Sequence, residues 1–315
     1  MPMFMPGRMQ MFMPGRVKKL FTGDHKEKAA TCEYIEVVVP GEASSLAGTV
    51  AVVNSVLRHT NQSVRFHLVV PHQTVTILRQ WLDGIPDSRL HYQIIAFPER
   101  LLKLANNDVE SAQVFLAGIL PTNITGRVIF ISNDAIVQGD IAELQQVPIA
   151  VHSFGAFLLD SQSETHADLA DKPLYSQQVN MMNRFVHKRH IKGTRVTFSG
   201  GVFVANMKYW RHTHAHRSLV AWLNIHKRMS IVGASPSATA HRAAMLLTFY
   251  GRVSVLPPKW HLRGLGVSEA TPYSESFVRS HKVIRWSGHL KPWMPNTPYR
   301  NLWLEYAVPD PIRKP

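Results

Sequence analysis

The chain has 315 residues, of which 45% are hydrophobic and 18% are charged. This is the composition of a globular protein, and it excludes a chain that is disordered throughout. The formal net charge of +14 predicts an affinity for anions. No zinc-finger spacing or RNA-recognition signature accompanies this charge, so we expect no nucleic-acid partner. A single cysteine, Cys32, excludes an internal disulfide and a cysteine metal cluster.

The N-terminal segment differs from the rest of the chain. Residues 3–8 (MFMPGR) recur as residues 11–16, and a short repeat with Pro-Gly pairs does not build a core element. We predict a flexible, basic, Met- and Pro-rich tail over residues 1–32 and a single domain over residues 33–315. No apolar run reaches the roughly 18 residues that span a bilayer. If the protein has a membrane tether, we expect it outside this chain.

Strands and helices alternate from Tyr34 onward. Apolar, β-branched runs predict strands at residues 36–39, 64–70, 90–97 and 128–131. Periodic apolar positions predict helices at residues 44–58, 74–82 and 114–120. This order predicts an α/β fold whose mostly parallel central sheet has helices on both faces.

The second half of the chain is less regular. Its predicted elements are a strand at 202–206, a helix at 212–227, a loop at 233–240 and a helix at 243–249. From Pro257 onward, the abundance of Trp, Pro and Gly predicts loops packed on the domain.

The first candidate site follows the predicted strand at residues 128–131. Ligands of parallel sheets bind beyond the carboxyl ends of the strands, and Ser132-Asn133-Asp134 lies directly after this strand. A carboxylate at Asp134 suits Mn²⁺ or Mg²⁺, which prefer hard oxygen ligands. Taken alone, an aspartate after a strand more often serves as a turn or capping residue.

Two further segments carry candidate chemistry. Residues 197–210 contain the pair Gly200-Gly201, and glycines allow a backbone to approach a ligand closely, although a tight turn before a strand explains the pair equally well. Residues 282–293 contain Arg285, Gly288 and Lys291. A guanidinium can pair bidentately with diphosphate oxygens.

Together the three segments resemble the signatures of glycosyltransferase family 8. The first resembles the family's Asp-x-Asp turn, the second its Phe-Asn-x-Gly-Val stretch and the third its His-x-x-Gly-x-x-Lys-Pro-Trp signature. The resemblance runs in register from Tyr34 to Pro311. The flanking segments are similar to the glycosyltransferase 8 domain-containing proteins, a Golgi branch of the family.

The resemblance implies a GT-A nucleotide-diphospho-sugar transferase fold. It also implies transfer of a sugar, with retention of configuration, from a UDP-sugar to an unknown glycan or protein acceptor in the Golgi lumen, with Mn²⁺ as the typical cofactor. It identifies no nucleophile or general base. The donor-binding residues that it implies are Ser132, Asn133, Asp134, Ser199, Gly201, Arg285, Gly288 and Lys291.

Four positions depart from the family pattern. Ser132 replaces the first Asp of the Asp-x-Asp turn, and Ser199 replaces the Asn of the second signature. Arg285 replaces the metal-binding His, and Ala117 replaces an Arg that precedes the turn. Because a guanidinium has no lone pair for a metal, Asp134 remains as a single, weak metal ligand.

These departures leave two hypotheses open. In the first, the chain is an active transferase in which Arg285 and Lys291 supply the charge of the missing metal. In the second, Arg285 pairs with Asp134 and fills the site, and the chain is a pseudoenzyme that binds a nucleotide sugar or a partner. Two glycosylation sequons, which begin at Asn61 and Asn123, favour a lumenal location.

Overall fold

The computed structural model describes residues 34–160 and 173–311. The predicted tail over residues 1–32 lies outside these ranges. Within them, no helix combines the length and the apolar character that crossing a bilayer requires.

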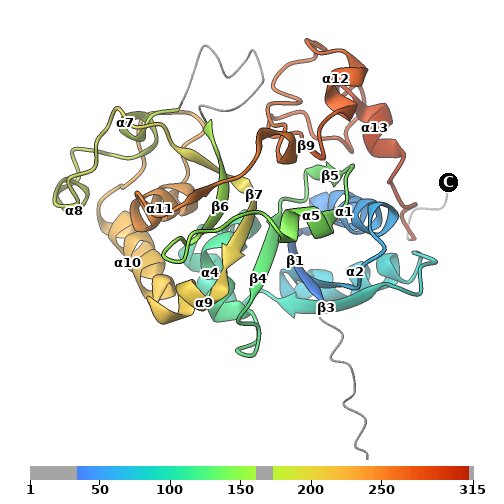
Figure 1. The fold of residues 1–315 in the computed structure, drawn as a ribbon, viewed down its shortest axis with the longest axis horizontal. Coiled ribbons are helices and arrows are strands. Elements are labelled where there is room, and N and C mark those ends of the chain that lie inside the picture. The colour runs from blue at the N-terminus through green and yellow to red at the C-terminus, as the bar shows by residue number, and fades with distance from the viewer. Residues whose placement is uncertain (1–33, 161–172, 312–315) are drawn as a thin grey trace, which may run out of the picture. The chain divides into compact units, whose positions relative to one another are not determined.

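A seven-stranded sheet forms the centre of the domain, with the strand order β3-β2-β1-β4-β7-β6-β8 (Figure 1). Its strands are β1 Ile35–Pro40, β2 Val64–Val70, β3 His91–Ala96, β4 Arg127–Ile131, β6 Gly155–Leu159, β7 Phe198–Asn206 and β8 Ser254–Val255. The pairs β1–β2, β2–β3, β1–β4 and β6–β8 are parallel, whereas β7 is antiparallel to β4 and β6. The predicted mostly parallel sheet is therefore confirmed. The reversal at β7 places the start of β7 beside the carboxyl end of β4.

Helices cover both faces of this sheet, as predicted (Figure 1). The helices α1 Leu46–His59, α2 Val75–Leu82 and α5 Ile141–Gln145 pack on one face. The helices α4 Ala112–Ile119, α9 Met207–His212, α10 Ala215–Arg228 and α11 Ala240–Phe249 pack on the other. Alternation along β1 explains the arrangement, because Val38 packs with the second group and Val37 and Val39 with the first.

A two-stranded antiparallel sheet of β5 Ala135–Val137 and β9 Val283–Arg285 lies beside the large one. A third apolar cluster fixes it to α1, with Ala51 packing against Ile136, Ile284 and Trp286. This pairing brings the C-terminal segment to the residues that follow β4.

The remaining helices are short. They are α3 Glu99–Leu104, α7 Tyr175–Gln178, α8 Arg184–His187, α12 Glu275–Arg279 and α13 Arg300–Leu304, with 3₁₀ turns at Ala43–Ser45, His72–Thr74, Val109–Ser111 and Pro258–Trp260. The prediction of loops after Pro257 was therefore wrong at β9, α12 and α13. The triplet of β9 is too short to show a period in sequence, and it is buried by pairing with β5.

Candidate active site

The predicted site lies at the carboxyl end of β4. A backbone hydrogen bond from Ser132 to the carbonyl of Gly201, with an N···O distance of 2.8 Å, joins this end to the start of β7. The residues that the sequence placed on two separate segments are thus neighbours in space. Ser132 and Asp134 are both buried.

Both carboxylate oxygens of Asp134 are paired with cations. Arg285 Nε donates to Oδ1 at 2.7 Å, and Lys291 Nζ donates to Oδ2 at 2.6 Å. Burial by itself raises the pKa of the Asp134 carboxyl, but the attraction of Arg285 and Lys291 outweighs burial and holds this pKa below its ordinary value of 3.8. Asp134 is therefore ionised at neutral pH and carries two charged partners.

The backbone around β9 holds these cations in place. Arg285 stands opposite Ala135 in the β5–β9 register, and Trp286 N donates to the carbonyl of Asp134 at 2.9 Å. Lys291 Nζ also donates to the carbonyl of Trp286 at 3.0 Å. Backbone contacts thus fix the segment that carries Arg285 and the ammonium group of Lys291.

Two glycines near these cations allow close packing, one against Arg285 and one against the backbone. A Cβ on Gly201 would stand 2.1 Å from Nη1 of Arg285, so the guanidinium lies directly against this residue. A Cβ on Gly288 would stand 2.1 Å from the carbonyl oxygen of Gly266. Both positions therefore need glycine for close approach.

The other predicted residues use their polar atoms within the protein. Ser132 Oγ donates to Oε2 of Glu110 at 2.8 Å, and Asn133 Nδ2 donates to Ser45 Oγ at 2.7 Å in a buried contact. Ser199 is buried on β7 and borders the cavity described next.

A cavity of about 350 Å³ opens beside Arg285. Its wall contains three predicted residues, namely Ser199, Gly201 and Arg285. The wall is completed by Asp108, Glu110, Gln113, Gly200, Ser237, Thr239, His241, Arg242, Arg263 and Ser287. Asp134, which stands behind Arg285, is not among the lining residues.

The acidic side of this cavity was not predicted. Glu110 belongs to the 3₁₀ turn before α4. Burial raises the pKa of its carboxyl above the ordinary value of 4.5; the charge of Arg285 opposes this rise, and the charge of Asp134 adds to it. In sequence, Asp108 and Glu110 show only the pattern of residues that cap a helix.

Asp108 orients an imidazole in the same wall. Its Oδ2 lies 2.9 Å from Nδ1 of His241, and Nε2 of His241 lies 3.2 Å from Thr239 Oγ1. The carboxylate favours the tautomer with the proton on Nδ1, which leaves the lone pair of Nε2 toward a hydroxyl. This arrangement can accept a proton from a hydroxyl group.

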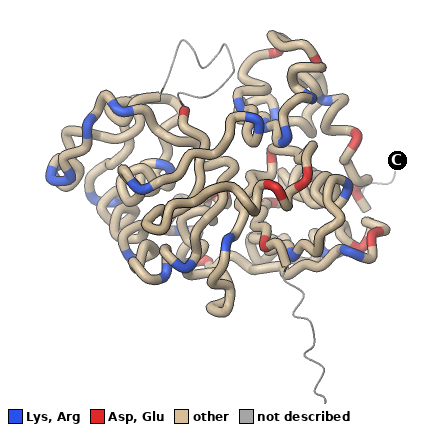
Figure 2. The backbone as a smooth tube through the Cα atoms, in the orientation of Figure 1, with Lys and Arg blue, Asp and Glu red and all other residues tan. Residues whose placement is uncertain are grey.

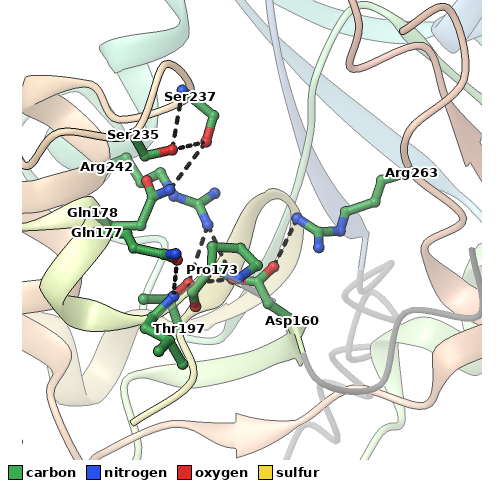
Figure 3. A network of polar contacts seen from close by, with 10 residues as sticks. Asp160, Pro173, Gln177, Gln178, Thr197, Ser235, Ser237, Arg242 and Arg263 are labelled. Carbon is green, nitrogen blue, oxygen red and sulfur yellow. Dashed lines mark hydrogen bonds and ion pairs between the residues drawn. The ribbon is translucent and has the colours of Figure 1, made fainter. Parts of the chain in front are cut away.

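The basic side of the cavity is built around Asp160, directly after β6 (Figure 3). This fully buried carboxylate forms ion pairs with Arg263 Nη1 at 2.8 Å and Arg242 Nη2 at 3.0 Å, and Thr197 Oγ1 donates to it. The sequence signal was present, because the apolar run of β6 ends in a carboxylate just as β4 leads to Asp134.

The side chain of His261 is buried among the same arginines. Burial lowers its pKa well below 6.5, and the positive charges of Arg285, Arg263 and Arg242 lower it further. The imidazole is therefore neutral. The positive potential on this side of the cavity comes from the arginines.

Comparisons with solved structures define the fold. The fold matches the galactosyltransferase LgtC, solved with donor and acceptor sugar analogues, at a TM-score of 0.62 and 12% identity over 89% of this chain and 98% of that one. It also matches the bifunctional glycosyltransferase WbbM at a TM-score of 0.62 and 16% identity over 88% of this chain and 50% of that one. The fold is thus that of the GT-A glycosyltransferases, as predicted.

Comparisons of sequence define the family. The model of glycosyl transferase family 8 matches residues 25–297. Glycosyltransferase 8 domain-containing protein 1 of Xenopus tropicalis is 31% identical over 89% of this chain and 78% of that protein. Human glycosyltransferase 8 domain-containing protein 2 is 28% identical over 89% of this chain and 83% of that protein. The chain belongs to glycosyl transferase family 8.

Proposed function

We propose that this family 8 protein transfers a sugar from a UDP-sugar to a glycan or protein acceptor with retention of configuration, and that it does so without a metal. The observation that carries the proposal is the position of Arg285. Its Nε is fixed on Asp134, while its guanidinium lies against Gly201 at the cavity wall. The Nη atoms can then donate to diphosphate oxygens without breaking the pair.

The Mn²⁺ typical of the family does not fit the residues present. Both oxygens of Asp134 are engaged by cations, and the neighbouring positions hold Ser132 and Arg285. Among the residues that the structure describes, no group of three His, Cys, Asp or Glu side chains could hold a metal ion. Lys291, whose side chain is 29% exposed, does not line the cavity; it pairs with Asp134 and adds positive potential behind Arg285.

The pair Asp108–His241 supplies a proton acceptor for the transfer. For retention, the acceptor oxygen bonds to the anomeric carbon on the face from which the diphosphate departs. The bond from that carbon to the diphosphate oxygen breaks, and its electron pair leaves with the diphosphate. The acceptor hydroxyl takes the place of the Thr239 hydroxyl at Nε2 of His241 and passes its proton to this nitrogen, while Arg285 stabilises the charge of the leaving group.

Calorimetry tests the proposal directly. We expect UDP, UDP-glucose or UDP-galactose to bind equally well with Mn²⁺ and with EDTA. The variant Arg285→Ala should weaken this binding at least about tenfold, since it removes charge-assisted hydrogen bonds. Arg279→Ala is the matched control, because Arg279 pairs with Glu275 and Glu305 on the surface. Binding that requires Mn²⁺ would contradict the proposal.

The alternative is a pseudoenzyme that binds a nucleotide sugar or a partner. The observation that favours it is the set of ion pairs among Asp134, Arg285 and Lys291, because Asp134 already binds both cations and offsets one of their two charges. The two functions differ in turnover. An active transferase transfers the sugar of a bound UDP-sugar to water or to an added acceptor and releases UDP. The pseudoenzyme binds the donor without releasing UDP.

We further propose that the protein resides in the Golgi lumen. The support is the family resemblance and the exposure of both sequon asparagines, Asn61 and Asn123. Each lies in a loop that follows a helix, where a glycan has room.

A further inference from the structure

Charge is segregated within the domain. The stretch from residue 173 to residue 268 contains no Asp and no Glu. It contains fourteen Lys and Arg residues, which are Arg184, Lys188, Arg189, Lys192, Arg195, Lys208, Arg211, Arg217, Lys227, Arg228, Arg242, Arg252, Lys259 and Arg263. Figure 2 shows the consequence: the part of the tube that carries α7 to α11 is marked by basic residues, and most acidic residues lie elsewhere. Because this part has almost no internal counter-charge, it presents a positive potential to solvent.

Hydrogen bonds join two segments of this basic part into one projecting tip. Asn183, the N-cap of α8, donates through Nδ2 to the carbonyls of Met229 and Ser230, both at 3.1 Å. Asn180 Nδ2 donates to the carbonyl of Ser230 at 3.0 Å. The turn before α8 therefore lies against the chain that leaves α10.

This contact gathers three exposed apolar side chains. Met182 is 92% exposed, Met229 is 39% exposed and Phe185 is 36% exposed. We call these three residues the apolar tip. Large apolar side chains that stand together in solvent are uncommon on soluble proteins and mark a surface that contacts another phase or partner.

Cations surround the apolar tip. Arg184, Lys188 and Arg228 are exposed beside it, and none of them takes part in an ion pair with another residue in the described ranges. The guanidinium of Arg184 stacks over the ring of Phe185 at 4.8 Å from its centroid. Long basic side chains beside apolar ones can keep their charges at headgroup level while the apolar groups enter a bilayer.

We propose that the apolar tip and its surrounding cations dock the protein onto a membrane surface that carries anionic lipid headgroups. Both features are needed for this partner, because apolar side chains partition into the acyl boundary and Lys and Arg attract anionic lipids. A hydrated polyanion such as an acidic glycan would leave the two methionines without a partner. Single-stranded nucleic acid needs a row of stacking aromatic side chains, and the tip has only Phe185.

Vesicle sedimentation of the full chain tests the docking surface. We expect binding to phosphatidylcholine vesicles that contain phosphatidylserine, weak binding to phosphatidylcholine alone, and loss of binding at high salt. The double variant Arg184→Glu/Lys188→Glu should bind at least about thirty-fold more weakly. Arg79→Glu/Arg100→Glu is the control with the same change in net charge on the exposed surface of α2 and α3, and it should bind nearly as the wild type does.

A second pair of variants tests the contribution of the apolar side chains to vesicle binding. Met182→Ser/Phe185→Ser should reduce vesicle binding without changing net charge, whereas Val151→Ser/Leu304→Ser, at two exposed apolar residues elsewhere, should not. An equal loss in the two charge-reversal variants would overturn the proposal, and so would the absence of binding to anionic vesicles. Retention on heparin or RNA without vesicle binding would also overturn it. Because no nucleotide sugar enters this experiment, its outcome is separate from that of the proposed transferase function.

Discussion

Arg285 and Asp134 form a buried ion pair, with an Nε–Oδ1 distance of 2.7 Å, beside the cavity that Arg285 lines. Lys291 closes the other side of the same carboxylate. The positive charge at this site therefore belongs to two side chains of the protein. Unlike a metal ion, this charge cannot be removed by a chelator.

Removing the carboxylate should destabilise the fold. Asp134→Asn removes the carboxylate that pairs with the buried Arg285 and with Lys291, so we expect the free energy of unfolding at pH 7 to fall by about 3 kcal/mol. Urea denaturation measures this change. In the Arg285→Met background the same substitution should cost less, because the pair is already broken. Equal costs in both backgrounds would show that the pair contributes nothing.

The same pair predicts a dependence of stability on acid. The pKa of Asp134 is lowered in the folded protein, so its contribution is present above the ordinary value of 3.8 and is lost as the pH falls through the lowered pKa. We expect Asp134→Asn to differ most from the wild type at neutral pH and least once the pH has fallen below the lowered pKa, where both carry a neutral side chain. Thermal unfolding at a series of pH values measures this difference.

Glu110 predicts the opposite dependence. Burial raises the pKa of its carboxyl, so the folded state holds this proton more tightly and the free energy of unfolding falls as the pH rises above 4.5. Glu110→Gln keeps an oxygen that can accept from Ser132 and should stabilise the protein by about 1 kcal/mol at neutral pH. Glu99→Gln on the exposed α3 serves as the control and should change stability little. A loss of stability in Glu110→Gln would contradict the assignment.

The turn that carries Lys291 depends on Gly288. An alanine there would place its Cβ about 2 Å from backbone atoms of Gly266 and Val267, which cannot rotate away. We expect Gly288→Ala to cost about 2 kcal/mol or more, as overpacking does. Gly126→Ala is the matched control, because a Cβ at that position meets nothing within 4 Å. It should be neutral or slightly stabilising, since alanine restricts the unfolded chain.

The sequence predicts those features of the fold that local periodicity encodes. The strands β1, β2 and β4 and the helices α1 and α2 follow from runs of apolar residues whose spacing is visible without a partner. β9 was missed because its three residues are too few to show a period and are buried by pairing with a strand distant in sequence. Only the assembled sheet supplies that signal.

Some residues of the candidate site could be predicted from the sequence, and others could not. Asp134, Arg285 and Lys291 could be proposed because each stands in a recognisable segment. The pair of Asp108 with His241 could not, since the two residues are 133 positions apart (241 − 108) and neither stands in a motif. Their contact arises when the 3₁₀ turn before α4 meets the start of α11, which is a consequence of packing across one face of the sheet.

The two sequons give a prediction about cellular location. Asn61 lies between α1 and β2, and Asn123 lies between α4 and β4, and both side chains belong to exposed residues. Oligosaccharyltransferase acts on accessible Asn-x-Ser/Thr sites of chains that enter the secretory pathway. If the protein resides in the Golgi lumen, the protein isolated from its own cells should lose mass on treatment with peptide-N-glycosidase.

Two sequon variants and a recombinant chain with an added leader serve as controls for this glycosidase experiment. Asn61→Gln and Asn123→Gln should each remove one glycan, and the double variant should be insensitive to the glycosidase. A recombinant chain directed into the secretory pathway by an added leader shows whether the two exposed loops are competent acceptors. If that chain is glycosylated and the native protein is not, the loops are accessible and the lumenal location is wrong. The exposure of both asparagines makes the native protein's glycans a direct report of the compartment through which it passed.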